Sequence, residues 1–152
     1  MISIFGAVSM GIIVLSVGAM LLHMKIMRKR VPVDNNLSQL EDLYRERVEI
    51  LLLVGDYDTE LYYLCLQYVD LDFASMQRAM PDIDAAFEDI LETGCQIEED
   101  TTARLVENAQ AIQKVTDALN KAITEYNEFI TTRPIEGLMA RILGLTIEGM
   151  FD

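Results

Sequence analysis

The sequence has few of the residues with which proteins bind metals, form disulfides or attack substrates. Its 152 residues include one histidine, two cysteines, three prolines and no tryptophan. Two cysteines cannot form a disulfide framework, and one histidine is too few for a Cys/His zinc site or for the paired Glu-x-x-His ligands of a di-iron bundle. We find no nucleophile elbow, P-loop or dinucleotide-binding glycine motif. These absences favour a protein that has no cofactor and is not an enzyme.

Acidic residues are numerous, but their spacing does not match a calcium-binding loop. Three D-x-D pairs occur, at Asp56 and Asp58, at Asp70 and Asp72, and at Asp82 and Asp84. An EF-hand loop needs glycine at its sixth position and glutamate at its twelfth. Loops that start at Asp56 or at Asp70 have neither residue in place. We therefore predict no metal site.

Charged residues are missing from the start of the chain and unevenly distributed after it. Residues 1–24 contain no Asp, Glu, Lys or Arg, and four basic residues follow at once: Lys25, Arg28, Lys29 and Arg30. All 25 acidic residues lie in residues 31–152 against eight basic ones, so this part carries a net charge of -17. So acidic a segment is unsuited to bind nucleic acid. No small-molecule substrate is evident either.

Residues 2–24 form an apolar run of 23 residues that is long enough to cross a membrane. As a helix it would measure roughly 34 Å, against a hydrocarbon core of about 30 Å. A cleaved signal peptide would have basic residues before the run and small residues after it, whereas bulky Met24, Ile26 and Met27 follow here. The sequence therefore predicts a transmembrane anchor with its basic flank over residues 1–30, in contact with the lipid bilayer.

The four basic residues also predict the orientation of this anchor. Short segments rich in Lys and Arg stay on the cytoplasmic side of a membrane. We therefore expect a single-pass protein of the cytoplasmic (inner) membrane, with its N-terminus outside and residues 31–152 in the cytoplasm.

The rest of the chain is predicted to be helical, with a linker at residues 31–36 and a helical bundle over residues 37–152. Asn36 can cap a helix whose apolar residues recur at steps of three and four. Residues 55–59 predict either a turn or a weak point within one long helix. Another helix is expected from Pro81, a residue tolerated in a first helical turn, to Thr93, with Gly94 just past its end.

The longest helix of the bundle is predicted from about Ile97 to just before Pro134. Eight residues step by three and four along it: Leu105, Ala109, Ile112, Thr116, Leu119, Ile123, Tyr126 and Ile130. Such a seam is typical of coiled coils and helical bundles. Because no segment alternates with a period of two, the predicted fold class is all-α: one N-terminal transmembrane helix followed by a long antiparallel helical bundle.

Residues after Pro134 predict a short apolar helix with Leu138, Ile142 and Leu145 on one face. We expect this face to cover the end of the bundle. The alternative is an exposed segment that docks on a partner or touches the membrane surface. The net charge of residues 31–152 is unfavourable for tight contact with an anionic leaflet.

Residues 118–151 resemble the LemA family of bacterial membrane proteins. The resemblance is carried by the segment ALNKAITEYNEFITTRP and by IEGLMARILGLTIEGMFD after it. The residues that match the family's pattern are Asn120, Tyr126, Asn127, Pro134, Leu138, Ala140, Gly144 and Phe151. The N-terminal span with its basic cluster also fits the family's plan. The resemblance implies a long antiparallel helical bundle on a single-pass anchor in a bacterial membrane.

Asn120 and Asn127 are seven residues apart and lie beside the predicted seam. An asparagine in such a place can hydrogen-bond a neighbouring helix and fix its register. The alternative is that both residues lie at the solvated edge of the seam.

Taken together, these features predict a non-enzymatic, membrane-anchored helical scaffold or interaction protein, which has a protein partner or associates with itself. A second hypothesis is a membrane-remodelling or holin-like lysis factor, whose action would depend on the span itself. A third is an enzyme with a metal bound by carboxylates.

Overall fold

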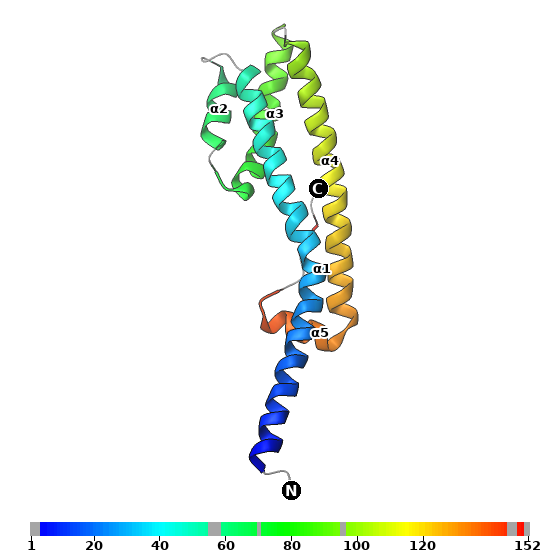
Figure 1. Ribbon diagram of the computed structural model, residues 1–152. Coiled ribbons are helices and arrows are strands. Elements are labelled where there is room, and N and C mark those ends of the chain that lie inside the picture. Colours follow the sequence, from blue (N-terminus) through cyan, green and yellow to red (C-terminus); the bar gives the residue numbers. More distant parts are fainter. Residues whose placement is uncertain (1–3, 55–58, 70, 95–96, 146–148, 151–152) are drawn as a thin grey trace. The chain divides into compact units, whose positions relative to one another are not determined.

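The described part of the chain consists of five helices and short connections. A computed structural model describes residues 4–54, 59–69, 71–94, 97–145 and 149–150. The helices are α1 (Ile4–Val54), α2 (Glu60–Tyr68), α3 (Phe73–Glu92), α4 (Glu99–Thr132) and α5 (Pro134–Ile142), shown in Figure 1. No strand occurs in these ranges, which confirms the all-α class.

The chain divides into two compact units, and α1 and α4 contribute to both. The first unit holds residues 1–36 and 118–152, so it contains the N-terminal part of α1, the C-terminal part of α4, and α5. The second unit holds residues 37–117, with α2, α3 and the remaining parts of α1 and α4.

Side chains at the starts of α2 and α3 explain why these helices begin where they do. Thr59 caps α2, because its hydroxyl accepts a hydrogen bond from the backbone N–H of Tyr62 at 3.3 Å. Asp72 caps α3 by accepting from the N–H of Ser75 at 3.0 Å. This hydrogen bond, and a second one from the Ser75 hydroxyl, hold the pKa of Asp72 below its usual value.

The core of the second unit is apolar and takes residues from all four of its helices. Its buried members are Val48, Ile50, Leu51, Leu61, Cys65, Met76, Ala79, Met80, Ile83, Ala86 and Leu105. Polar contacts surround this core: the Arg45 guanidinium donates to the carbonyl of Val69 at 2.8 Å, and Arg47 pairs with Asp84 at 2.7 Å. The Arg45 contact satisfies a carbonyl just past the end of α2.

In the first unit α1 and α4 bury matching apolar stripes. Ile26 and Val33 are the buried residues of α1 there, seven residues apart. The buried residues of α4 are Leu119, Ile123, Tyr126 and Ile130, which are the last four of the predicted seam. Steps of three, four and seven are those of helices that pack along their length.

Two predicted boundaries are confirmed. Between Val54 and Glu60 the sequence left a turn and a weak point within one helix open; Thr59, just before α2, has extended backbone angles, and residues 55–58 are outside the described ranges. Gly94 follows the end of α3 with a φ of 84°, as its predicted place requires. The longest helix of the bundle was expected from about Ile97 to Pro134, and α4 runs from Glu99 to Thr132.

Two predicted boundaries at prolines are wrong. Residues 31–36 are not a linker, since α1 continues through Pro32 without a break, and Asn36 is an interior residue whose amide donates to the carbonyl of Pro32 at 2.7 Å. Pro81 does not start a helix, because α3 begins eight residues earlier at Phe73. In both cases a proline removes one backbone donor, and burial of a neighbouring side chain, Val33 or Met80, holds the helix together.

Candidate functional site

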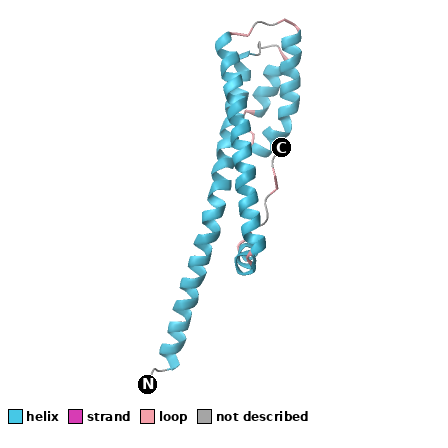
Figure 2. Cartoon of the chain, turned by 90° about the vertical axis from the view of Figure 1, so that its right-hand side faces the viewer, coloured by secondary structure: helices cyan, strands magenta, loops and turns pink. Residues whose placement is uncertain are grey.

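The N-terminal part of α1 exposes apolar side chains over its whole circumference. From Ser9 to Lys25 every side chain is exposed except that of Leu22, which is half-buried. Within its own unit this part of the helix extends past α4, and α5 crosses it only near its end (Figures 1 and 2). Among the described residues, α1 holds the one segment that is long and apolar enough to cross a membrane. Such a segment is either a membrane span or a signal sequence.

The four basic residues that follow lie where α1 begins to pack against α4. Lys25 and Arg28 are exposed. The Lys29 ammonium pairs with the Glu125 carboxylate at 3.3 Å. Arg30 pairs with Asp34 at 3.4 Å, and its guanidinium lies 5.8 Å from the centre of the Tyr126 ring. Half of the cluster therefore contacts other residues of the protein, besides any role in orientation.

The bend between α4 and α5 depends on a proline and a glycine. Arg133 has extended backbone angles, and Pro134 starts α5, where a residue without an N–H is tolerated. Gly137 lies so close to the end of α4 that an added Cβ would be 2.3 Å from the carbonyl oxygen of Ile130. The backbones of α4 and α5 can therefore approach each other only where the side chain is absent.

The end of α5 turns back toward α4 through a Schellman motif. Gly144 has a φ of 71°, and its N–H donates to the backbone carbonyl of Arg141. The N–H of Leu145 donates to the carbonyl of Ala140 at 2.8 Å. The turn places the carbonyl of Leu145 where the buried Tyr126 hydroxyl donates to it at 3.1 Å. The structure thus brings together Tyr126 and Gly144, two residues that the LemA resemblance had singled out.

The predicted packing of the α5 face is wrong for Leu138 and Ile142. Both side chains are exposed, by 62% and 71%, and Ala140 is buried in their place. Leu145, the third residue of that face, is half-buried. Beside Leu138 lies an open groove of about 690 Å³, lined by residues of α4, α5 and the turn after it: Ile130, Thr131, Pro134, Gly137, Leu138, Ala140, Arg141 and Leu145.

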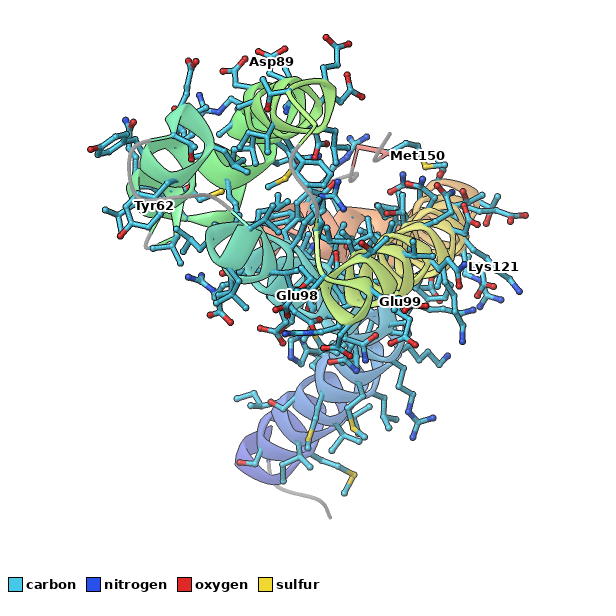
Figure 3. The ribbon with its side chains drawn as sticks, turned by 90° about the horizontal axis from the view of Figure 1, so that it is seen from above. Tyr62, Asp89, Glu98, Glu99, Lys121 and Met150 are labelled. Atoms are coloured by element: carbon cyan, nitrogen blue, oxygen red, sulfur yellow. The ribbon has the colours of Figure 1, made fainter. Side chains whose placement is uncertain are left out.

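Asn120 and Asn127, two further residues of the resemblance, are not among the residues that line this groove. Asn120 and Asn127 are both half-buried on α4, and their backbone carbonyls accept hydrogen bonds from the hydroxyls of Thr124 and Thr131. Phe151 lies outside the described residues. Figure 3 shows Lys121, next to Asn120 in sequence, pointing away from α4.

Asn108, a buried polar residue between α4 and α1 in the second unit, was not predicted from the sequence. Only 4% of it is exposed, and its amide donates to the Leu43 carbonyl at 2.9 Å and to the Glu46 carboxylate at 3.4 Å. Its Oδ1 atom is buried and has no hydrogen-bond partner among the described residues. The signal in the sequence was its position, since Asn108 lies three residues after Leu105, on the seam side of α4.

Among the described residues of the second unit, Cys65 is the buried thiol to consider as a nucleophile. Burial raises the pKa of the Cys65 thiol to about 11, and the nearby Asp84 carboxylate adds to this effect. Such a thiol is protonated at neutral pH and is a poor nucleophile. Within the described ranges no three His, Cys, Asp or Glu side chains are placed to hold a metal ion.

The second unit does expose an apolar groove. Its volume is about 410 Å³, and it lies between the C-terminal part of α3 and the start of α4, lined by Phe87, Leu91, Ile97, Thr102, Leu105, Val106 and Ala109. Acidic side chains such as Asp89, Glu98 and Glu99 are exposed on the same two helices or next to them (Figure 3).

The features that stand out are thus an exposed apolar helix with a basic flank, an exposed apolar face on α5 and an apolar groove in the second unit. A scan against protein-family models, a search of curated proteins and a search of solved structures each find no match to this chain.

Proposed function

We propose that the protein is a non-enzymatic, single-pass, membrane-anchored helical scaffold or interaction protein. The observation that carries this proposal is that α1 is at once exposed and apolar in its first part and built into a helical bundle in its second part. An apolar helix surface without packing partners in water is an aggregation liability, whereas in a bilayer it is the required surface. The rest of α1 then ties the folded part to that anchor.

The basic residues support an orientation with the folded part in the cytoplasm. Lys25 and Arg28 are exposed directly after the apolar segment, and short basic flanks remain on the cytoplasmic side. The compartment we propose is the cytoplasmic membrane of a bacterial cell, which the LemA-like plan of the chain also favours.

The proposed role in binding other proteins is supported by the apolar groove of the second unit. Leu91 and Val106 line this groove and are 45% and 51% exposed. Exposed apolar side chains that cluster at a groove are typical of protein interaction sites. The partner is either another protein or a second copy of this chain.

The second candidate is a holin-like or membrane-remodelling factor. It is favoured by the continuous apolar surface of α1, which would suffice for action within the membrane. It does not account for a buried core of the second unit with capped helices and Arg47 paired with Asp84. A lysis factor has little need of such a core.

Expression of residues 25–152 without the apolar segment distinguishes the scaffold from the lysis factor. A soluble, helical fragment that unfolds cooperatively supports the scaffold, since the bundle then folds without the span. A fragment that has no cooperative transition supports the lysis factor. Affinity capture of the full-length, membrane-bound protein and identification of what it retains would then test for a protein partner.

A further inference from the structure

The helix α5 carries an apolar face that points away from its own unit. Ile135, Leu138 and Ile142 are 68%, 62% and 71% exposed, at the spacing of one helix face. The opposite side of α5 is the packed one, with Ala140 buried and Gly137 against the end of α4. This arrangement is the reverse of that of a surface helix in water, whose outward side is ordinarily polar.

Contacts between α1 and α4 place α5 at the end of the apolar run of α1. The pairs Lys29–Glu125 and Arg30–Tyr126 set the register of these antiparallel helices. Thr132, the last residue of α4, is about six residues beyond Tyr126. In antiparallel helices the same distance is counted backward along α1, from Arg30 to Met24, so the end of α4 lies near Met24. Burial agrees with this register, since Ile26 is the first buried residue of α1 in the described part.

The direction of α5 is that of a helix lying on a surface which α1 crosses. Figure 1 shows α5 running across α1, and in Figure 2, turned by 90°, α5 is seen down its own axis. If α1 spans a bilayer, a helix crosswise to it lies along the plane of that bilayer.

The charge near α5 has the opposite sign to the charge of the rest of the folded part. Residues 25–30 and 131–145 together hold six basic residues and one acidic residue, whereas residues 31–130 hold six basic and 22 acidic ones. Arg141 is exposed, at the edge of the apolar face of α5. A basic margin beside an apolar face suits the anionic headgroups of a phospholipid leaflet.

We propose that α5 is an interfacial membrane helix: Ile135, Leu138 and Ile142 insert among the headgroups of the leaflet that α1 leaves. The occupant of this face is the anionic phospholipid bilayer. The inference rests on the proposed function only in that α1 spans the same membrane. It adds a second attachment, which holds the bend between α4 and α5 at the membrane surface.

The test uses full-length protein with Cys65→Ala and Cys95→Ala, reconstituted in vesicles of phosphatidylcholine and phosphatidylglycerol. Single cysteines at Leu138 and at Ile142 carry an environment-sensitive fluorophore, as does one at the exposed Gln110 of α4. Lipids with a spin label near the headgroup should quench the α5 labels at least about twofold more than the Gln110 label, because an interfacial helix buries its apolar face by about 5–10 Å. Aqueous iodide should show the reverse order.

A label at Leu15, in the middle of the apolar segment, tells the two hypotheses apart. If Leu15 is reached only by spin labels deep in the acyl chains while Leu138 and Ile142 are quenched by iodide like Gln110, the membrane anchor stands and the interfacial helix is overturned. If Leu138 and Ile142 are shielded from both quenchers, a second copy of the chain covers the face and the proposal is equally overturned. If Leu15 itself is quenched by iodide, the anchor fails and the proposed function fails with it.

Discussion

At the scale of single residues, the bend after α4 depends on the side chain that Gly137 lacks. We expect Gly137→Ala to lower the free energy of unfolding by about 1–3 kcal/mol, the usual cost of forcing an atom into packed surroundings. The new Cβ would meet the carbonyl oxygen of Ile130 at 2.3 Å, and a backbone atom cannot move aside cheaply. Denaturant titration of the detergent-solubilised protein measures the change.

Gly149→Ala is the matched control for this substitution. No atom lies within 4 Å of a Cβ built at Gly149, and its φ is not in the left-handed region. The control should therefore leave the midpoint nearly unchanged. Equal effects of the two substitutions would mean that the close approach at Gly137 does not exist in solution.

Cys65 is the second residue whose behaviour follows from its surroundings. With Cys95→Ser, we expect the folded protein to react with a disulfide reagent at pH 8 about a hundredfold more slowly than the unfolded protein, because a thiol with a pKa of about 11 is almost fully protonated there. The rate should rise about tenfold per pH unit up to pH 10. Reaction as fast as in guanidinium would contradict the burial of Cys65.

The raised pKa of Cys65 also predicts how stability changes with pH. The folded thiol keeps its proton up to about pH 11, while the unfolded thiol loses it at a lower pH. The folded state therefore loses stability as the pH rises above the pKa of the unfolded thiol. Below that value the thiol contributes no pH dependence.

At the scale of elements, the sequence predicted well where periodicity was long and poorly where proline was the only guide. The bounds of α4 were within two residues, because its apolar residues recur over many turns and Gly and Pro are absent from it. Pro32 and Pro81 were taken as helix boundaries, yet each lies inside a helix. A proline removes one backbone hydrogen bond of a helix. The sequence around it does not show whether side-chain packing elsewhere along the helix stabilises the helix by more than this loss.

The candidate site was predicted in part. Periodicity correctly predicted a short helix after Pro134, but the charged residues Glu136 and Arg141 are next to the packed residues Gly137 and Ala140 in the sequence, so the pattern of polar residues did not show which side is packed. The smallest residues, Gly137 and Ala140, face α4 because only they allow the close approach, and the large ones are left outside. The roles of Gly137 and Asn108 could not be inferred without the neighbouring helix. Gly137 lies against the carbonyl of Ile130, on the other side of the bend, and Asn108 donates to the carbonyl of Leu43, which is distant in sequence.

Asn108 provides a prediction for the pairing of α4 with α1 in the second unit. Asn108→Asp has nearly the same shape, but an ionised carboxylate cannot donate to the Leu43 carbonyl and would face the Glu46 carboxylate. We expect it to lower the free energy of unfolding by about 2–4 kcal/mol at pH 7. The loss should shrink on acidification, as the new carboxyl group becomes protonated and able to donate.

Gln110→Glu is the control for the added charge. Gln110 is exposed on the same helix, so the same change of one negative charge should cost far less there. Similar losses at both positions would show that net charge, and not the buried contact of Asn108, is responsible.

At the scale of the whole molecule, the orientation in the membrane is the property to measure. In protein without Cys65 and Cys95, a cysteine in place of Ser3 should react with a membrane-impermeant thiol reagent added to intact bacterial cells, whereas one in place of the exposed Met150 should not. The reason is the basic flank, which stays on the cytoplasmic side. The opposite labelling pattern would reverse the proposed topology.

Exchange of the basic flank for acidic residues extends this measurement. Replacing Lys25, Arg28, Lys29 and Arg30 by Glu should produce a mixed or inverted orientation. The change also removes the Lys29 contact with Glu125, so Lys29→Gln serves as the control that loses this contact while three basic residues remain. The control should keep the original orientation.

The long sequence separation between partners on α1 and α4 has a consequence for synthesis on the ribosome. Lys29 and Glu125 are 96 residues apart, and the buried Ile26 and Val33 belong to a compact unit whose other part, residues 118–152, is made last. At a translation rate of about 5–20 residues per second, this stretch of α1 waits on the order of 5–20 s for its partner. A nascent chain interrupted before α4 would thus expose the apolar stripe of Ile26 and Val33, a target for chaperones and proteases that is buried in the finished chain.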